Sequence, residues 1–534
     1  QLAPAPCAAG GAAEAEAGPT TSIADVLAML EDRTLEEDRQ RLLRELPGPM
    51  REMGKEEALV VLNRAVVAGT LHKFWFDWAV KSGGPGQNIV FPTSVVPQGE
   101  MPYLDAMIVI SNPKDARRMA RAHVRKAKTY GIAFLGKGVL STRDIDDWRE
   151  QREHLSEAFL PMASLAKIFD VSRARAEFAA NTRLAKEIRD DKGNLVPVEI
   201  NEFLLYEAMA QLQLSLLGED PTYMDETNVP LRQSFKKALT LSSDVVEAAR
   251  VRSESRRVVH GYSNGVVDRS FDSAGCPRHI GAAESLAHPE CPVSGPLMSR
   301  IADVCPDSKV KRDNASTFLF AGHDTTANLM THFIYYVVTN PGWQEKVQAE
   351  ADRFMAKGEA LRFQDLQELS VIKRCINETL RLAPSVPNGT FREVQYDDFI
   401  EGPNGEPVKV SKGQPFVVPP WSLHHNKELW GDDVEEFNPD RKWLPEEDWF
   451  GDTFRAYNPE SERYCPFTFG PRSCIGRPFA MMEARLILAA LFHKYTFELA
   501  GATKAAAGLS EISVNIGTLG PANGMYVLCH PRNA

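Results

Sequence analysis

The stretch of sequence that decides the fold is FTFGPRSCIG, at residues 467–476. It has the pattern FxxGxRxCxG, and an amphipathic helical pattern follows it at once. Gly470 and Gly476 let the backbone turn tightly around Cys474 and aim N–H groups at its sulfur. The following helix adds its positive N-terminal end, so we expect both effects to lower the pKa of Cys474. The pattern predicts a cysteine that serves as a thiolate ligand rather than as a buried free thiol.

A second pattern lies inside the apolar helix predicted over residues 315–339. It consists of Ala321 and Gly322, followed by His323, Asp324 and Thr325. Glycine costs about 1 kcal/mol relative to alanine inside a helix, and threonine is a poor helix former, so this choice of residues indicates a use. Taken alone, side chains that bond to the nearby backbone are an equal explanation.

Two residue pairs show helical spacing. Glu378 and Arg381 lie three apart on one helical face, where both charges can meet a partner across the interior, although an exposed pair is the alternative. Trp148 and Arg152 are one helical turn apart, and an indole N–H and a guanidinium are suitable donors to a carboxylate.

From about residue 60 to the C-terminus, these motifs and their order resemble the cytochrome P450 superfamily. The resemblance implies a single large haem domain, mainly α-helical with small β-sheets. It also implies haem b with Cys474 as the axial thiolate, Phe467 packed beside the sulfur, and dioxygen as co-substrate. A thiolate ligand favours cleavage of the O–O bond.

The resemblance assigns roles to the other residues. Ala321 and Gly322 would leave room for dioxygen, and Asp324 and Thr325 would relay protons. The haem propionates would be bound by Trp148, Arg152, Arg392 and Arg472. A buried ionic network with a structural role would be formed by Glu378, Arg381 and Arg441.

The charge balance excludes one class of function. The formal net charge of −11 argues against a nucleic-acid-binding protein, which needs a basic surface. A local basic run is nevertheless present, and it is either a solvated helix face or a docking site for an acidic electron donor on the cysteine side of the haem. The run consists of Arg117, Arg118, Arg121, Arg125, Lys126 and Lys128.

Eight irregularly placed cysteines predict a reducing, intracellular location. No apolar run reaches the roughly 18 residues of a membrane span, so the chain as given is expected to be soluble. Membrane association is expected only if an anchor or targeting segment precedes residue 1.

The chain divides into a flexible leader at 1–22, a helical extension at 23–54 and the haem domain at 55–534. Short β-runs at 88–96 and 105–111 predict a small sheet. Gly, Ser and Pro accumulate at 251–296, which predicts mostly loop in place of a long helix over the substrate pocket. In that loop two Cys-His pairs have the spacing of a zinc site, with a flexible loop as the alternative. They are Cys276, His279, His288 and Cys291.

The expected function is insertion of one oxygen atom of dioxygen into an apolar organic substrate. Electrons would come from a reductase or ferredoxin, with NADPH acting only indirectly. We expect the substrate to contact Phe318 and residues 386–389 and 516–521. Two alternatives stay open: a peroxide-using or rearranging enzyme on the same fold, and a non-catalytic haem sensor or carrier.

Overall fold

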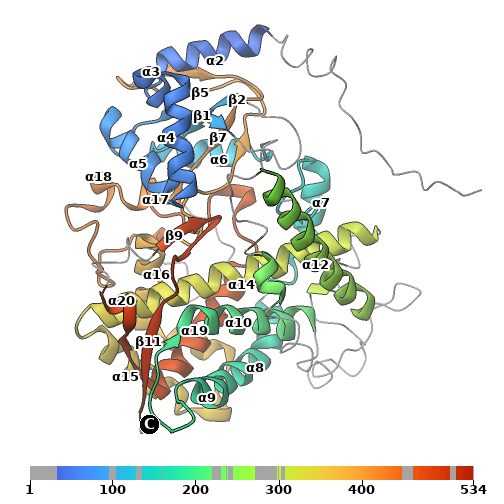
Figure 1. Ribbon diagram of the computed structural model, residues 1–534, viewed down its shortest axis with the longest axis vertical. Helices are drawn as coiled ribbons and strands as arrows, with labels where there is room; N and C mark the ends of the chain where they lie inside the picture. Colours follow the sequence, from blue (N-terminus) through green and yellow to red (C-terminus); the bar gives the residue numbers. More distant parts are fainter. Residues whose placement is uncertain are drawn as a thin grey trace, which may run out of the picture.

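The computed structural model shows a mainly α-helical chain with small β-sheets, as the sequence predicts (Figure 1). The structure describes residues 33–94, 104–127, 135–159, 162–218, 230–235, 237, 245–270, 297–298, 300–301, 307–447, 461–505 and 513–532.

The N-terminal part packs four helices on a four-stranded sheet. Strands β1 (Ile89–Ser94) and β2 (Leu104–Val109) pair antiparallel, which confirms the predicted β-runs. Strand β2 also pairs with β7 (Pro415–Val417) in parallel, and β7 pairs antiparallel with β4 (Arg392–Glu393). Leu42 is buried in the same apolar cluster as Ile108 of the sheet, so helix α2 is part of this layer. The helices are α2 (Arg33–Glu45), α3 (Pro49–Met53), α4 (Lys55–Val67) and α5 (Leu71–Ser82).

The helical body is built around α14 (Ser308–Thr339), which crosses the molecule in Figure 1. It packs against α10 (Ile200–Leu212), α16 (Ser370–Leu382) and α19 (Arg477–Lys494). Because neighbours surround it, α14 is buried on nearly all sides, and its buried residues include polar as well as apolar side chains. Two π-helical turns continue other helices: Ala179–Leu184 follows α8 (Met162–Phe178), and Gln213–Leu217 follows α10. Other helices of the body are α6 (Pro113–Ala122), α7 (Ile145–Ser156), α8 (Met162–Phe178), α9 (Ala185–Glu187), α15 (Trp343–Met355), α17 (Pro420–His424), α18 (Lys427–Trp430) and α20 (Gly501–Ala505).

The prediction of a loop over 251–296 is wrong for its first part, because residues Val245–Ser270 form the long helix α12. Its buried face mixes small polar and apolar side chains at helical spacing, namely Ser255, Val259, Ser263 and Val266. The Ser263 hydroxyl is satisfied by a 2.8 Å contact with Ser316 of α14. Because serines occupy part of this buried stripe, apolar residues do not recur regularly at helical spacing, which is the pattern on which the prediction depended. Residues 271–296 lie outside the described part.

Three further sheets, formed mainly by later segments, occur among the described residues. One has the order β3-β11-β8, one is the hairpin of β9 and β10, and one pairs β5 with β6. The strand β10 contacts α14, which brings the end of the chain against the middle of the longest helix. The strands are β3 (Val198–Glu199), β5 (Asp398–Glu401), β6 (Pro407–Val410), β8 (Tyr495–Leu499), β9 (Ser513–Ile516), β10 (Thr518–Pro521) and β11 (Tyr526–Pro531).

Candidate functional site

The loop around Cys474 is closed by its own backbone. The N–H of Cys474 donates to the carbonyl of Phe467 at 3.0 Å, and the N–H of Ser473 donates to the carbonyl of Gly470 at 2.9 Å. Gly470 has φ +67°, and a Cβ there would lie 3.1 Å from the Ala120 carbonyl oxygen of α6. Only glycine allows the loop to turn and to approach α6 so closely. Helix α19 starts at Arg477, three positions after Cys474.

The predicted direction of the Cys474 pKa is wrong for the protein without a bound metal. Burial raises the pKa of this thiol above its usual value, although the Arg152 charge and the backbone N–H groups of Gly476 and Arg477 act to lower it. The N–H groups are therefore aimed at the sulfur as predicted, but desolvation of the thiolate outweighs them. A bound metal ion is the further charge that deprotonates a coordinating thiol.

Cys474 is accessible although protein surrounds it. Its side chain has exposed surface, yet the protein around it desolvates the thiol. Arg152 of α7 lies near enough to feel the Cys474 charge, because burial lowers the pKa of this guanidinium while the Cys474 charge raises it. An accessible thiol with a largely buried guanidinium near it fits a haem, whose iron needs a ligand and whose propionates need cations.

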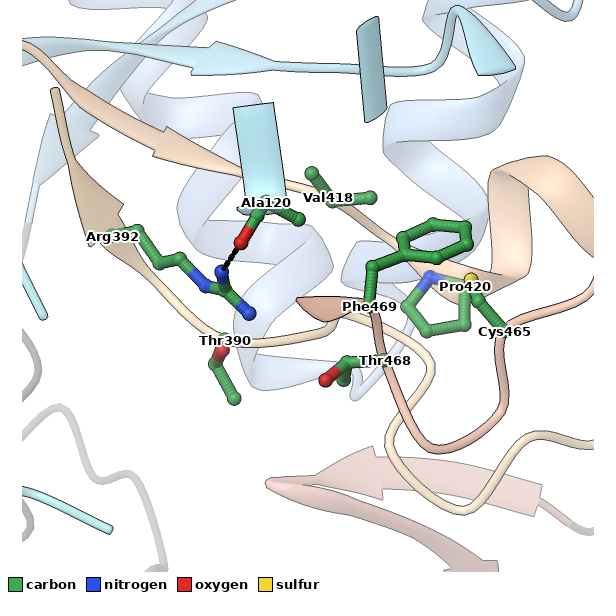
Figure 2. Close-up of a pocket in the computed structure, with 8 residues that line it drawn as sticks. All are labelled: Ala120, Thr390, Arg392, Val418, Pro420, Cys465, Thr468 and Phe469. Carbon is green, nitrogen blue, oxygen red and sulfur yellow. Dashed lines mark hydrogen bonds between the residues drawn. The ribbon is translucent and has the colours of Figure 1, made fainter. Parts of the chain in front are cut away.

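Buried cations lie beside this loop. Lys126 is 2% exposed and Arg392 is 3% exposed. Burial, followed by the charges of Arg392 and Arg472, holds the pKa of Lys126 well below its usual value. Buried positive charges are costly, and two carboxylates from a haem would lower that cost. In Figure 2 the Arg392 guanidinium donates to the Ala120 carbonyl at the edge of a small pocket that also contains Thr468.

Sequence reasoning missed Lys126, which it counted in the exposed basic run. Helix α6 ends at Ala122, and Lys126 then forms a β-bridge with Arg392. That contact joins segments far apart in the sequence, so no local pattern around Lys126 could predict its burial.

Arg472 and Trp148 lie together. The Arg472 Cζ lies 4.2 Å from the centroid of the Trp148 ring, and Trp148 is 5% exposed. The Arg472 guanidinium also donates to the backbone carbonyls of Val124, Val139 and Thr142. The structure thus shows these two residues fastening the Cys474 loop, while their contact with a propionate stays a prediction.

The acid and alcohol of α14 have different partners. The Thr325 hydroxyl donates to the Ala321 carbonyl at 2.8 Å, one turn earlier in the helix. The Asp324 carboxylate instead accepts a hydrogen bond from Thr518 of β10. A Cβ at Gly322 would lie 3.1 Å from Leu212, so this glycine lets α10 and α14 pack closely. Its predicted role in making room for dioxygen stays a prediction.

The residues expected to contact the substrate lie in different environments. Phe318 is 5% exposed and stacks on Phe159, with 5.4 Å between ring centroids, so its ring packs in the core. Gly389 is buried against the Val418 carbonyl. Ile516 belongs to β9, whose side chains lie outside the described set, and Thr518 faces Asp324.

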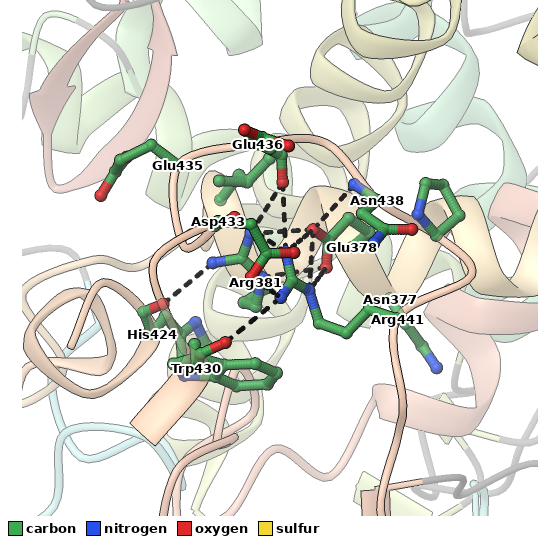
Figure 3. Close-up of polar contacts among 12 residues, drawn as sticks. Asn377, Glu378, Arg381, His424, Trp430, Asp433, Glu435, Glu436, Asn438 and Arg441 are labelled. Atoms are coloured by element: carbon green, nitrogen blue, oxygen red, sulfur yellow. Dashed lines mark hydrogen bonds and ion pairs between the residues drawn. The ribbon is translucent and has the colours of Figure 1, made fainter. Parts of the chain in front are cut away.

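Glu378, Arg381 and Arg441 are brought together in a buried ionic cluster (Figure 3). Arg381 donates to both Glu378 oxygens, at 2.9 and 2.8 Å, and Arg441 approaches the same carboxylate at 3.2 Å. Burial would lower the pKa of Arg441, but the Glu378 charge and its hydrogen bonds raise it overall. Arg381 also donates hydrogen bonds to the backbone carbonyls of His424 and Glu436. The cluster therefore joins α16 to the segment before the Cys474 loop.

Comparison with known proteins agrees with this geometry. The sequence profile of the family described as "Cytochrome P450" matches residues 306–512. The protein named "Cytochrome P450 monooxygenase himC" of Aspergillus japonicus is 28% identical over 368 residues, which are 66% of this chain and 62% of that protein. "Cytochrome P450 52A12" of Debaryomyces hansenii is 27% identical over 391 residues, 67% of this chain and 69% of that protein.

The chain belongs to the cytochrome P450 superfamily. A "Cytokinin hydroxylase" of Arabidopsis thaliana is 35% identical to this P450 over 190 residues, 35% of this chain and 33% of the relative. The P450 therefore spans about a third of the length of that relative and of a second one with the same name. No helix in the part that the structure describes is long and apolar enough to cross a membrane.

The basic run of this P450 is divided among several environments. Arg118 pairs with Asp398, Arg117 with Glu462, and Lys126 is buried. Lys128 and the four residues considered for zinc lie outside the described part. Within the described residues, no group of three or more His, Cys, Asp or Glu side chains is placed to hold a metal ion.

Proposed function

We propose that this P450 is a haem-thiolate monooxygenase that binds haem b through Cys474 and inserts one atom of dioxygen into an apolar organic substrate. The observation that carries the proposal is the accessible Cys474 thiol, which receives two backbone N–H groups at the start of α19 and lies within reach of the Arg152 charge. When bound, the haem supplies the activation of dioxygen. Relatives named as a hydroxylase and a monooxygenase support the proposal.

The protein holds the cofactor by charge and by shape. Gly476 and Arg477 donate N–H groups to the sulfur, which restrains its charge and fixes its direction. Phe467 packs on the main core and helps to keep water from the loop. The cations that would bind the propionates are Lys126, Arg152, Arg392 and Arg472.

Asp324 and Thr325 would handle protons on the opposite side. Both side chains are only partly buried in a helix whose other residues are mostly buried, so they can exchange protons with water. Thr325 is held by the Ala321 carbonyl, and Asp324 is held by Thr518. Asp324 and Thr325 are consecutive residues of α14, and these separate contacts fix the orientation of each side chain.

A carbon monoxide difference spectrum of the reduced, haem-supplemented protein tests the ligand. The thiolate-type absorption band is expected, and Cys474→Ser should remove it. Cys465→Ser is the matched control, because Cys465 is a 1% exposed thiol nine positions earlier in the chain. A band that survives in Cys474→Ser, or that is lost in both variants, contradicts the assignment.

Isotopically labelled dioxygen tests the reaction class. With NADPH and a reductase or ferredoxin, a product of the monooxygenase contains one labelled oxygen atom. Turnover with hydrogen peroxide alone indicates the peroxide-using or rearranging alternative. Ligand binding without any consumption of reductant indicates a sensor or carrier.

The electron donor would dock on the face of α6, whose Ala120 and Arg121 contact Gly470 of the cysteine loop. Arg125 is 39% exposed and pairs with Glu393 at 3.8 Å, so its charge is accessible. Charge reversal at Arg121 and Arg125 should slow reduction at low salt, where surface charges are least screened. An unchanged reduction rate would remove this docking site from the proposal.

A further inference from the structure

Asp324 is held by a residue far from it in the sequence. Its Oδ2 accepts a hydrogen bond from the hydroxyl of Thr518, the first residue of β10. Thr518 is 9% exposed, so little water competes for this bond. A hydrogen bond to a carboxylate is stronger than one between neutral groups, and more so where water is scarce. Thr518 therefore fixes the orientation of the Asp324 carboxyl group.

Two buried asparagines extend this contact into α10. The Nδ2 of Asn328 donates to the Thr518 hydroxyl at 3.4 Å, and the Nδ2 of Asn201 donates to the Asn328 Oδ1 at 3.0 Å. In this series of hydrogen bonds every donor points toward Asp324, so Asn201, Asn328 and Thr518 together hold its carboxyl oxygen in place. Burying two amides costs free energy, and a contact that only fastened the hairpin would not need them.

The strand β10 is attached to α14 at a second place. The N–H of Leu519 donates to the Ser385 carbonyl at 2.9 Å, and the Ser385 hydroxyl donates to the Thr325 carbonyl at 2.9 Å. A Cβ at Gly520 would lie 2.7 Å from the Asn328 Oδ1, so glycine is needed for this close approach. Thr518 thus cannot leave Asp324 without disturbing both attachments.

We propose that Thr518 is a positioning residue for proton delivery, because it holds one carboxylate oxygen of Asp324 while the acid passes protons toward bound dioxygen. The inference rests on the proposed function, in which Asp324 relays protons. Without substrate, four electrons and four protons reduce dioxygen to two waters when the protons arrive in time. When the protons arrive late, dioxygen takes up only two electrons and two protons and leaves as hydrogen peroxide. The electrons come from NADPH through a flavoprotein reductase.

The test measures hydrogen peroxide formed per NADPH oxidised by the haem-loaded protein, which needs no known substrate. Thr518→Val should raise this fraction about threefold and change the solvent deuterium isotope effect on NADPH oxidation, since a lost charge-assisted contact slows the step. Thr518→Ser keeps the hydroxyl and should restore both values. The matched control is Thr317→Val, which removes a 2% exposed hydroxyl that bonds to the Asp313 carbonyl on the same helix.

A second measurement does not depend on activity. In urea unfolding of the haem-free protein, the midpoint shift of the Thr518→Val and Asp324→Asn double variant should be smaller than the sum of the single shifts, because the two changes break one contact. Additive shifts would show that the contact is absent and would overturn the inference.

The outcomes separate the two proposals. If Asp324→Asn leaves the peroxide fraction unchanged, the proton role of Asp324 and the inference both fail, while the Cys474 assignment is judged by its own spectrum. If Asp324→Asn raises the fraction and Thr518→Val does not, only the inference is overturned. A Thr518→Val effect that serine does not restore indicates packing alone and overturns it as well.

Discussion

The guanidinium of Arg472 lies over the indole ring of Trp148, with 4.2 Å between its Cζ and the ring centroid. The same group donates to the carbonyl oxygens of Val124 at 3.0 Å, Val139 at 3.1 Å and Thr142 at 3.1 Å. One side chain two positions before the cysteine therefore ties its loop to the chain between α6 and α7.

Arg472→Lys should destabilise the haem-free protein by about 2 kcal/mol. Lysine has one compact ammonium, so it cannot reach three carbonyls and stack on an indole at once, and each lost contact contributes about 1 kcal/mol. Urea unfolding measures the loss, and transfer of haem to an excess of a haem-scavenging protein should be faster. Arg117→Lys, at a surface pair with Glu462, is the control. Equal stability of the two variants would contradict the fastening role.

Glu378→Ala should cost about 3 to 5 kcal/mol, because it leaves two arginine charges buried without their carboxylate. Arg381 and Glu378 have fully buried side chains, and Arg441 is only 5% exposed. The comparison variant is Asp146→Ala, whose partner Arg149 is 64% exposed, and it should change stability by less than about 0.5 kcal/mol. Denaturant unfolding of both haem-free variants checks this, and similar costs would mean that burial of the cluster is energetically unimportant.

The mainly α-helical class, the strands β1 and β2 and the helix after Cys474 could be predicted, because period and turn residues are local signals. Helix α12 could not, since its buried face uses Ser255 and Ser263 where apolar residues are expected. The partner of the buried Ser263 hydroxyl is Ser316 on another helix, so the local sequence does not show that this serine is buried.

The candidate site shows the same limit. Sites whose residues are close together in the sequence, such as the loop of Cys474 or the Glu378 and Arg381 pair, could be predicted. The burial of Lys126 beside Arg392 and the contact of Thr518 with Asp324 depend on pairing between distant segments. The direction of the Cys474 pKa also depends on how many protein atoms surround the thiol, which a motif does not contain.

Gly389→Ala should destabilise the protein by about 3 kcal/mol. Its φ is +68°, which strains alanine by roughly 1 kcal/mol, and an added Cβ would overlap the Val418 carbonyl, at a cost of roughly 2 kcal/mol more. Gly193→Ala separates the two effects, because Gly193 has φ +81° with nothing within 4 Å of the added atom. Thermal or urea unfolding should show about 1 kcal/mol for that control, and equal losses would mean that backbone strain alone matters.

His72 makes the stability of the protein depend on pH. The side chain is 0% exposed and stands edge-on to Trp421, with 4.5 Å between ring centroids. Among the residues that the structure describes, neither of its ring nitrogens has a hydrogen-bond partner. Burial, with smaller effects from the Lys73 and His425 charges, lowers the pKa of His72 from 6.5 to about 3.

Between these two pKa values the unfolded chain binds a proton at His72 that the folded chain does not, so the free energy of unfolding falls as pH falls from 6.5 toward 3. At about pH 4.5 this group alone should cost about 3 kcal/mol relative to pH 7.5. His72→Phe keeps a ring against Trp421 and cannot be protonated, so it should lose about 3 kcal/mol less between the two pH values. Urea unfolding at both pH values checks this, because every other titrating group contributes equally to both proteins. Parallel losses in the variant and the native chain would show that His72 accepts a proton while folded, through an opening of the contact between α5 and α17.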